Sequence, residues 1–186
     1  MVDQTSTRCG LVEVHFAGLQ AADVTLTSLL NGRERARLER IVTEADRGRF
    51  LLGVVLLRRV VGAHLGIEPE RVEIDRTCIT CGEWHGKPTI PGSDLQLSVA
   101  HSATLVAVAT AAGYRIGIDV EQIRERPAEQ IRRWTAAEAR FKADPGADLP
   151  VYDVPVPHAG YLVTLATDAP SSIVLALTQV SAPLRS

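Results

Sequence analysis

The sequence predicts an α+β fold of two pseudo-repeated halves, each a small antiparallel sheet packed on a long helix, with the second half abbreviated. Two observations lead to this prediction. A long apolar helical segment precedes several short β-rich segments, and a shorter helical segment precedes two more. The 186 residues suffice for one ordinary domain or two half-domains sharing a core. We place the division between residues 1–112 and residues 113–186.

The first half is predicted to begin with a strand, because residues 11–16 alternate apolar and polar side chains. Residues 34–42 predict a charged helix. Thr43 and Asp46 form a near capping box that opens a second helix, apolar and mostly buried, which Gly66 and Pro69 end. Strands are then expected over four segments: 72–75, 95–100, 105–111 and 115–121.

The second half is predicted to return to helix over residues 128–142, with a fresh start at Thr135. The Asp144-Pro145-Gly146 sequence breaks this helix. Residues 161–166 and 173–178 predict a closing hairpin.

Composition excludes several classes of protein. Hydrophobic residues make up 46% and charged residues 23%, which excludes a mainly disordered chain. A net charge of -2 argues against a nucleic-acid partner. The longest apolar run stops at Arg58, well short of the roughly 18 residues that suggest a membrane span. The first residues do not resemble a signal peptide, and three cysteines argue against a disulfide framework, so we expect a cytoplasmic protein.

Arginines are concentrated between positions 33 and 59, where eight of them accompany four acidic residues. Two interpretations are open. The segment is either a solvated helical face with ion pairs, or part of a pocket for a polyanionic small molecule, since guanidinium groups bind phosphate bidentately.

Two pairs of charged residues could carry chemistry. Asp119 and Glu121 are two positions apart in a predicted strand, so they share a face and suit Mg²⁺, unless they are independent exposed acids. Glu138 and Lys142 are four positions apart on a helix and share a face. The alternative is that Glu138 closes a capping box with Thr135 and that Lys142 forms a surface ion pair.

Two further segments carry weaker signals. Cys78, Cys81 and His85 resemble half of a zinc site, but a closed structural site needs four ligands, which disfavours zinc. His101 follows a predicted strand, where a structural histidine is the common case, and no serine-hydrolase elbow accompanies it.

Taken together, "HGKP", "SVAHS", "GIDVE" and "WTAAEARFK", in this order, resemble the 4′-phosphopantetheinyl transferase superfamily. The resemblance is to its larger, pseudo-dimeric, surfactin-synthetase-type branch and covers about residues 30–142. It implies Mg²⁺-dependent transfer of phosphopantetheine from coenzyme A to a serine of an acyl or peptidyl carrier protein, with release of 3′,5′-ADP. Such carriers belong to fatty-acid synthesis or to secondary metabolism.

The resemblance also implies roles for individual residues. Asp119 and Glu121 match the metal-binding acids, and Glu138 matches a third acid that is ligand or base. Lys142 matches the lysine one helical turn later, so the implied catalytic residues are Asp119, Glu138 and Lys142. The coenzyme A contacts implied by the resemblance are three basic residues: Arg49, Lys87 and His101.

Several departures from the family pattern keep other hypotheses open. Ala137 and Ala100 stand where the family has a lysine and a serine, and "ADPGADLP" lacks the usual glycine-lysine turn. Only 12 residues separate Glu121 from Trp134, where the family has a longer stretch. The leading hypothesis is an active transferase. The alternatives are a degenerate homologue that binds coenzyme A, an acyl thioester or a partner protein, and an enzyme performing another reaction on a thioester or nucleotide.

Overall fold

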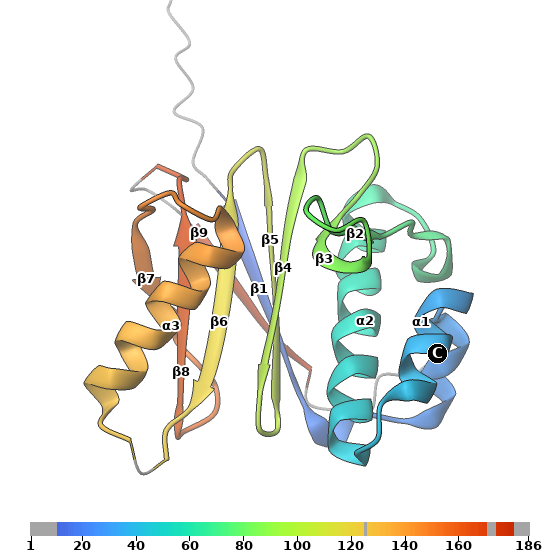
Figure 1. Ribbon diagram of the computed structural model, residues 1–186, viewed down its shortest axis with the longest axis horizontal. Helices are drawn as coiled ribbons and strands as arrows, with labels where there is room; N and C mark the ends of the chain where they lie inside the picture. Colours follow the sequence, from blue (N-terminus) through green and yellow to red (C-terminus); the bar gives the residue numbers. More distant parts are fainter. Residues whose placement is uncertain (1–10, 125, 171–173, 181–186) are drawn as a thin grey trace, which may run out of the picture.

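Two sheets lie side by side between helices. The structure is a computed structural model and describes residues 11–124, 126–170 and 174–180. The first sheet has the order β4-β5-β1-β9 and the second the order β6-β8-β7. Helix α2 lies beside the first sheet, with α1 on its outer side, and α3 lies beside the second sheet (Figure 1). The predicted α+β class is therefore confirmed.

The strands of the first sheet have these bounds: β1 (Leu11–Gly18), β4 (Leu95–Ser102), β5 (Leu105–Ala112) and β9 (Val174–Val180). Those of the second sheet are β6 (Ile116–Gln122), β7 (Val151–Asp153) and β8 (Tyr161–Thr167). A separate hairpin pairs β2 (Asp75–Thr77) with β3 (Trp84–Thr89).

Local sequence determines where the first two helices begin and end. Asn31 and Glu34 form a capping box at α1 (Gly32–Arg40). The Thr43 side chain caps α2 (Glu44–Leu65) by accepting a hydrogen bond from the Asp46 amide, as predicted. Gly66 ends the helix with φ +67°. Short 3-10 turns fill the connections: η1 (Leu19–Ala21), η2 (Val24–Leu29) and η3 (Pro69–Arg71).

The core is divided between the sheets and the helices. Side chains of β1 and β5 on one face of the first sheet pack with Ile118 of β6 and Leu165 of β8. The opposite face of the first sheet packs against α2, for example through Val108 and Leu57. Because both faces of β5 are covered, it is apolar at nearly every position, as expected of a central strand.

Helix α3 (Ala128–Ala143) is continuous, so the predicted fresh start at Thr135 is wrong. Thr135 lies inside the helix, where its hydroxyl donates to the Arg132 carbonyl at 3.1 Å and contacts the Thr164 hydroxyl at 2.8 Å. The alternative in which Glu138 closes a capping box with Thr135 is therefore also wrong, and Glu138 is available for another role.

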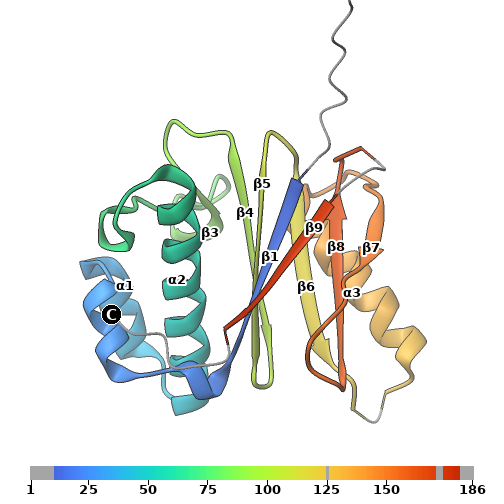
Figure 2. The ribbon, with the colours of Figure 1, turned by 180° about the vertical axis from the view of Figure 1, so that it is seen from behind.

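Several strand predictions were also wrong. Residues 72–75 form a strand only at Asp75, and β3 and β7 were not predicted. Residues 161–166 and 173–178 do not make a hairpin: β8 pairs with β6 and β7, whereas β9 pairs in parallel with β1 (Figure 2). Ile173, the first residue of that predicted hairpin strand, lies outside the described residues. The first sheet is consequently mixed rather than antiparallel throughout, because its last strand, β9, runs parallel to β1.

Within the described residues, none of the helices combines the length and the apolar character that crossing a membrane requires.

Candidate active site

The edge strands β4 and β6 of the two sheets run along each other, and we call this line the seam. Serine side chains of β4 join them. The Ile118 amide donates to Ser98 Oγ at 3.0 Å, and the Gln122 amide donates to Ser102 Oγ at 3.2 Å. Both pairs have the same offset in the sequence, so the strands run in the same direction. The final residues of β4 and β6 therefore meet at one end of the seam.

Asp119 of β6 lies on the seam and is only 6% exposed. Lys142 Nζ donates to its Oδ1 at 2.6 Å, while its Oδ2 is buried and has no hydrogen-bond partner among the described residues. Burial raises the pKa of Asp119 above its ordinary value, with Lys142 opposing the rise and Glu121 and Glu138 adding to it. A buried carboxylate oxygen without a partner is costly, which marks it as a place for a cation.

Two further carboxylates accompany Asp119. Glu121 is two residues along β6 and accepts a hydrogen bond from the Ser102 hydroxyl at 2.9 Å. Glu138 is half-buried on α3 and close enough to influence Asp119. Within the part of the chain that the structure describes, these three acids do not form a set whose ligand atoms all lie within 4.8 Å of one another. Ser102 instead holds Glu121, and Lys142 holds Asp119.

Helix α3 reaches Asp119 because residue 117 has no side chain. A Cβ on Gly117 would lie 2.0 Å from the Ala139 carbonyl oxygen and 2.4 Å from the Ala143 nitrogen. This close packing holds Glu138 and Lys142 above β6. This role of Gly117 was not predicted, although a glycine inside a strand is a known signal of close backbone approach.

Basic groups from the first half meet the acids at the seam. Arg49 Nη1 donates to the Ala103 carbonyl oxygen at 2.6 Å, and its Nη2 pairs with Asp46 at 2.6 Å. Desolvation lowers the pKa of His101, and the nearby charges of Arg49 and Lys142 lower it further. Electrostatic interactions therefore link six of the seven predicted site residues, although the three acids do not converge on one point: Arg49, His101, Asp119, Glu121, Glu138 and Lys142.

The turn between β4 and β5 is strained beside these residues. Ala103 has φ +48°, a conformation that favours glycine. The turn is held by the Thr104 amide and hydroxyl, which contact the Tyr161 hydroxyl at 3.2 and 2.9 Å, and by the Leu19 amide, which donates to the Thr104 carbonyl at 2.7 Å. Strain of this kind is concentrated at functional sites, and no sequence pattern revealed it.

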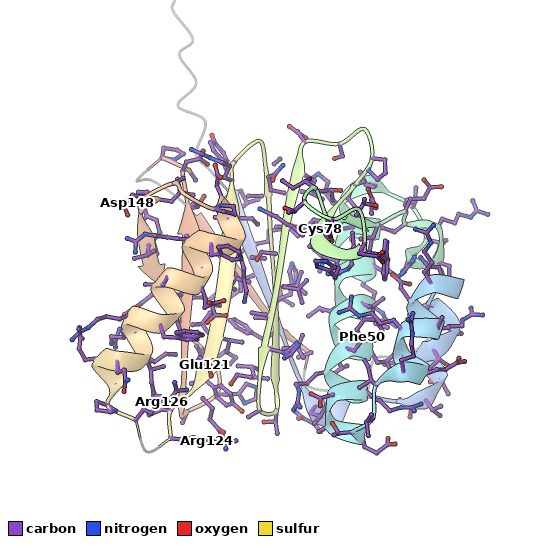
Figure 3. All side chains as sticks on the ribbon, viewed as in Figure 1. Phe50, Cys78, Glu121, Arg124, Arg126 and Asp148 are labelled. Carbon is purple, nitrogen blue, oxygen red and sulfur yellow. The ribbon has the colours of Figure 1, made fainter. Side chains whose placement is uncertain are left out.

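Lys87, the seventh predicted residue, lies apart from the others. Its Nζ donates to the carbonyl oxygens of Ile116 at 2.9 Å and Ala143 at 3.1 Å, and burial lowers its pKa. Ile116 begins β6, whereas Glu121 lies near its far end (Figure 3). Lys87 thus joins β3 to β6 and α3, and its contact with coenzyme A stays a prediction.

The arginine-rich segment has more than one function. Arg58 is buried and pairs with Glu34 at 2.9 Å, so it serves the fold. A cavity of about 590 Å³ near it is lined by Arg33 and Arg71 as well, but also by three acidic side chains: Glu70, Glu73 and Asp75. This balance does not favour a polyanion in that cavity. Arg49, in contrast, lies at the seam.

Comparison with known proteins identifies the family. Residues 20–113, just over half of the chain, match the family model described as "4′-phosphopantetheinyl transferase, N-terminal". The chain is also 34% identical over 103 residues to HetI, a 4′-phosphopantetheinyl transferase of Nostoc sp. (strain PCC 7120). The matched part is 53% of this chain and 41% of HetI, so the match spans less than half of that relative. The chain therefore belongs to the 4′-phosphopantetheinyl transferase family.

Proposed function

We propose that this chain transfers 4′-phosphopantetheine from coenzyme A to a serine of an acyl or peptidyl carrier protein, with Mg²⁺. The observation that carries the proposal is the buried Asp119 carboxylate, which has one oxygen on Lys142 and the other without a partner. Family membership supplies the reaction class, and the seam supplies acids and bases from both halves of the chain.

The residues at the seam fit a magnesium ion. Mg²⁺ prefers hard oxygen ligands and is commonly bound by one or two carboxylates plus substrate phosphates. Asp119 Oδ2 is such an oxygen, and Glu121 and Glu138 carry further carboxylates beside it. When bound, the ion would neutralise charge on the diphosphate oxygens. Asp119, Glu121 and Glu138 are thus its proposed ligands.

The chain's basic residues would hold the substrate. Lys142 Nζ lies at Asp119 and would turn toward a phosphate of coenzyme A, while Arg49 and His101 supply further donors from the first half. Desolvation and neighbouring positive charge favour the neutral form of the His101 ring, which can donate one hydrogen bond.

The transfer needs a base for the carrier serine. As the serine oxygen bonds to the β-phosphorus of coenzyme A, its proton passes to the Glu138 carboxylate, directly or through water. The bond from that phosphorus to the bridging oxygen breaks, and 3′,5′-ADP leaves. If Glu138 is also a metal ligand, one of its carboxylate oxygens would bind the ion and the other would accept the proton.

We further propose that the chain represents the pseudo-dimeric, surfactin-synthetase-type branch with a shortened second half, acting in the cytoplasm on carriers of secondary metabolism or fatty-acid synthesis. The connection after β6 supports the shortening, because β6 ends at Gln122 and α3 begins at Ala128. Little chain is left there to flank a carrier protein.

That short connection also favours a second candidate function, a homologue that binds coenzyme A or an acyl thioester, or a partner protein, without transfer. Ala137 and Ala100 lack the side chains that the family pattern places there. The retained Asp119, Glu121, Glu138 and Lys142 favour the transferase instead.

The deciding experiment incubates the chain with an apo carrier protein, coenzyme A and Mg²⁺ and measures the intact mass of the carrier. We expect a phosphopantetheine mass gain, a loss of rate of about 100-fold or more in Asp119→Asn, and an unchanged rate in Asp148→Asn. Asp148 is the matched control because its side chain is 95% exposed and pairs with Arg140 instead. No gain with several carriers would refute the transferase, and coenzyme A binding in that case would support the second candidate.

A further inference from the structure

The β2–β3 hairpin holds a cluster of three metal-binding side chains away from the seam. Cys78 follows β2, Cys81 lies in the connecting turn, and His85 is in β3. Their ligand atoms all lie within 4.8 Å of one another, and Cys81 Sγ is 3.0 Å from His85 Nε2. Both cysteines are free thiols. Cys78 lies far from Glu121 in Figure 3.

The backbone of the turn builds this cluster. The Cys78 amide donates to the Glu83 carbonyl oxygen at 2.7 Å, and the Gly82 amide donates to the Cys78 carbonyl oxygen at 2.8 Å. Gly82 has φ +76°, which closes the turn directly after Cys81. A Cβ on Gly86 would meet the Thr77 carbonyl oxygen at 2.9 Å, so glycine there lets β3 lie close against β2.

Two sulfurs and an imidazole nitrogen are ligands that zinc prefers. Around a tetrahedral zinc ion with Zn–S bonds near 2.3 Å and Zn–N bonds near 2.0 Å, ligand atoms are about 3.5–3.8 Å apart. The spacings between the three ligand atoms differ from these values by no more than about 1 Å. Small side-chain rotations would therefore bring the atoms to zinc-binding positions. The backbone amides of Cys81 and Thr80 donate toward the Cys78 sulfur, so the turn also orients that ligand atom.

We propose that Cys78, Cys81 and His85 bind one zinc ion, with solvent in the fourth position. Cys81 and His85 are exposed, so the ion is accessible and the fourth position faces water. Three ligands are too few for a closed structural zinc site, which disfavoured zinc from the sequence, but three protein ligands and a water is an established zinc arrangement.

Bound zinc would stabilise the hairpin and, through Lys87, its contact with β6 and α3. Lys87, two residues after His85, donates to carbonyl oxygens of β6 and α3. A cross-link between the turn and β3 therefore stabilises the strand from which Lys87 joins the two halves.

The test titrates the reduced, chelator-treated 186-residue chain with Co²⁺ and records the thiolate-to-cobalt charge-transfer absorption. We expect one thiolate-bound Co²⁺ per chain, displaced by Zn²⁺. The variants Cys78→Ser, Cys81→Ser and His85→Gln should each weaken binding by about 100-fold or more, whereas exposed His64→Gln should not change it. Circular dichroism of each variant separates loss of a ligand from loss of the fold.

A second readout uses the wild-type chain alone. The sequence has three cysteines, and zinc should protect two of them from alkylation, as counted by mass. Absence of the cobalt–thiolate absorption, equal affinity in the ligand variants, or alkylation of all three cysteines in saturating zinc would each overturn the proposal. Transfer to a carrier protein is not part of this test, so its outcome is independent of the proposed function.

Discussion

Replacing Gly117 by alanine tests how the site is held together. The added Cβ would lie 2.0 Å from the Ala139 carbonyl oxygen and 2.4 Å from the Ala143 nitrogen, where ordinary contact begins at 3.4 Å. These are backbone atoms of α3 and cannot rotate away, so the helix must retreat from β6 by about 1.4 Å. Lys142 and Glu138 move with it, away from Asp119.

Overpacking typically costs about 1–3 kcal/mol, and an immovable backbone places Gly117→Ala near the upper end, about 3 kcal/mol. For a chain of this size the melting temperature should fall by about 6–12 °C. The assay is thermal unfolding followed by circular dichroism, with Gly32→Ala as control because a Cβ there meets nothing within 4 Å. A Gly117→Ala variant that melts with the wild type and the control would refute the proposed packing of α3 on β6.

Three other changes have outcomes that the structure predicts. Asp119→Asn should not lower the melting temperature even where it slows the proposed transfer, because burial makes the ionised carboxylate unfavourable; a large drop in a thermal melt would contradict this. Arg58→Met leaves Glu34 without its ion-pair partner in the core and should lower the free energy of unfolding in urea by about 3–5 kcal/mol. The control Arg35→Met, at an exposed position, should lower it by less than about 0.5 kcal/mol. Similar values for both variants would show that the buried pair is unimportant. The lowered pKa of His101 means that its contribution to stability is full above pH 6.5 and is lost as the pH falls below it. When the pH is lowered from about 7.5 to about 5.5, the melting temperature of His101→Gln should therefore fall less than that of the wild type. Equal falls would contradict the lowered pKa of His101.

Local signals were enough to predict the elements that carry the site. The Thr43 cap, the apolar helix after it and the strand with Asp119 and Glu121 each depend on neighbouring residues, and each is present. The i,i+4 spacing also placed Glu138 and Lys142 on one helical face. The pairing of Lys142 with Asp119 was not predicted, because it depends on the close approach that Gly117 permits.

Other features depend on contacts between distant parts of the chain. The parallel pairing of β9 with β1 joins the end of the sequence to its beginning, and no local pattern distinguishes it from a hairpin. In the sequence, Arg58 is a charged residue at the end of an apolar run. In the structure it is a core residue, because Glu34 and the carbonyl oxygens of Pro69 and Val72 accept its hydrogen bonds. Those contacts also hold the carbonyl groups of the 3-10 turn η3 (Pro69–Arg71) and of Val72, where a strand was expected to begin.

The exposed hairpin shows a similar limit. The letters of β3, "WHGKPT", contain a glycine and a proline and do not predict a strand. Without that strand, His85 has no defined position relative to Cys78 and Cys81, and Lys87 has no defined partners. Their placement follows from the turn at Gly82 and from the packing of Gly86 on β2.

The most direct test of the proposed metal site at the seam is a titration with Mn²⁺ in place of Mg²⁺, followed by electron paramagnetic resonance with and without coenzyme A. We predict one Mn²⁺ site per chain that requires Asp119, binds more tightly with coenzyme A, and persists in Asp148→Asn. Equal Mn²⁺ binding by Asp119→Asn and the wild type in the presence of coenzyme A would contradict the assignment of the seam as the metal and substrate site.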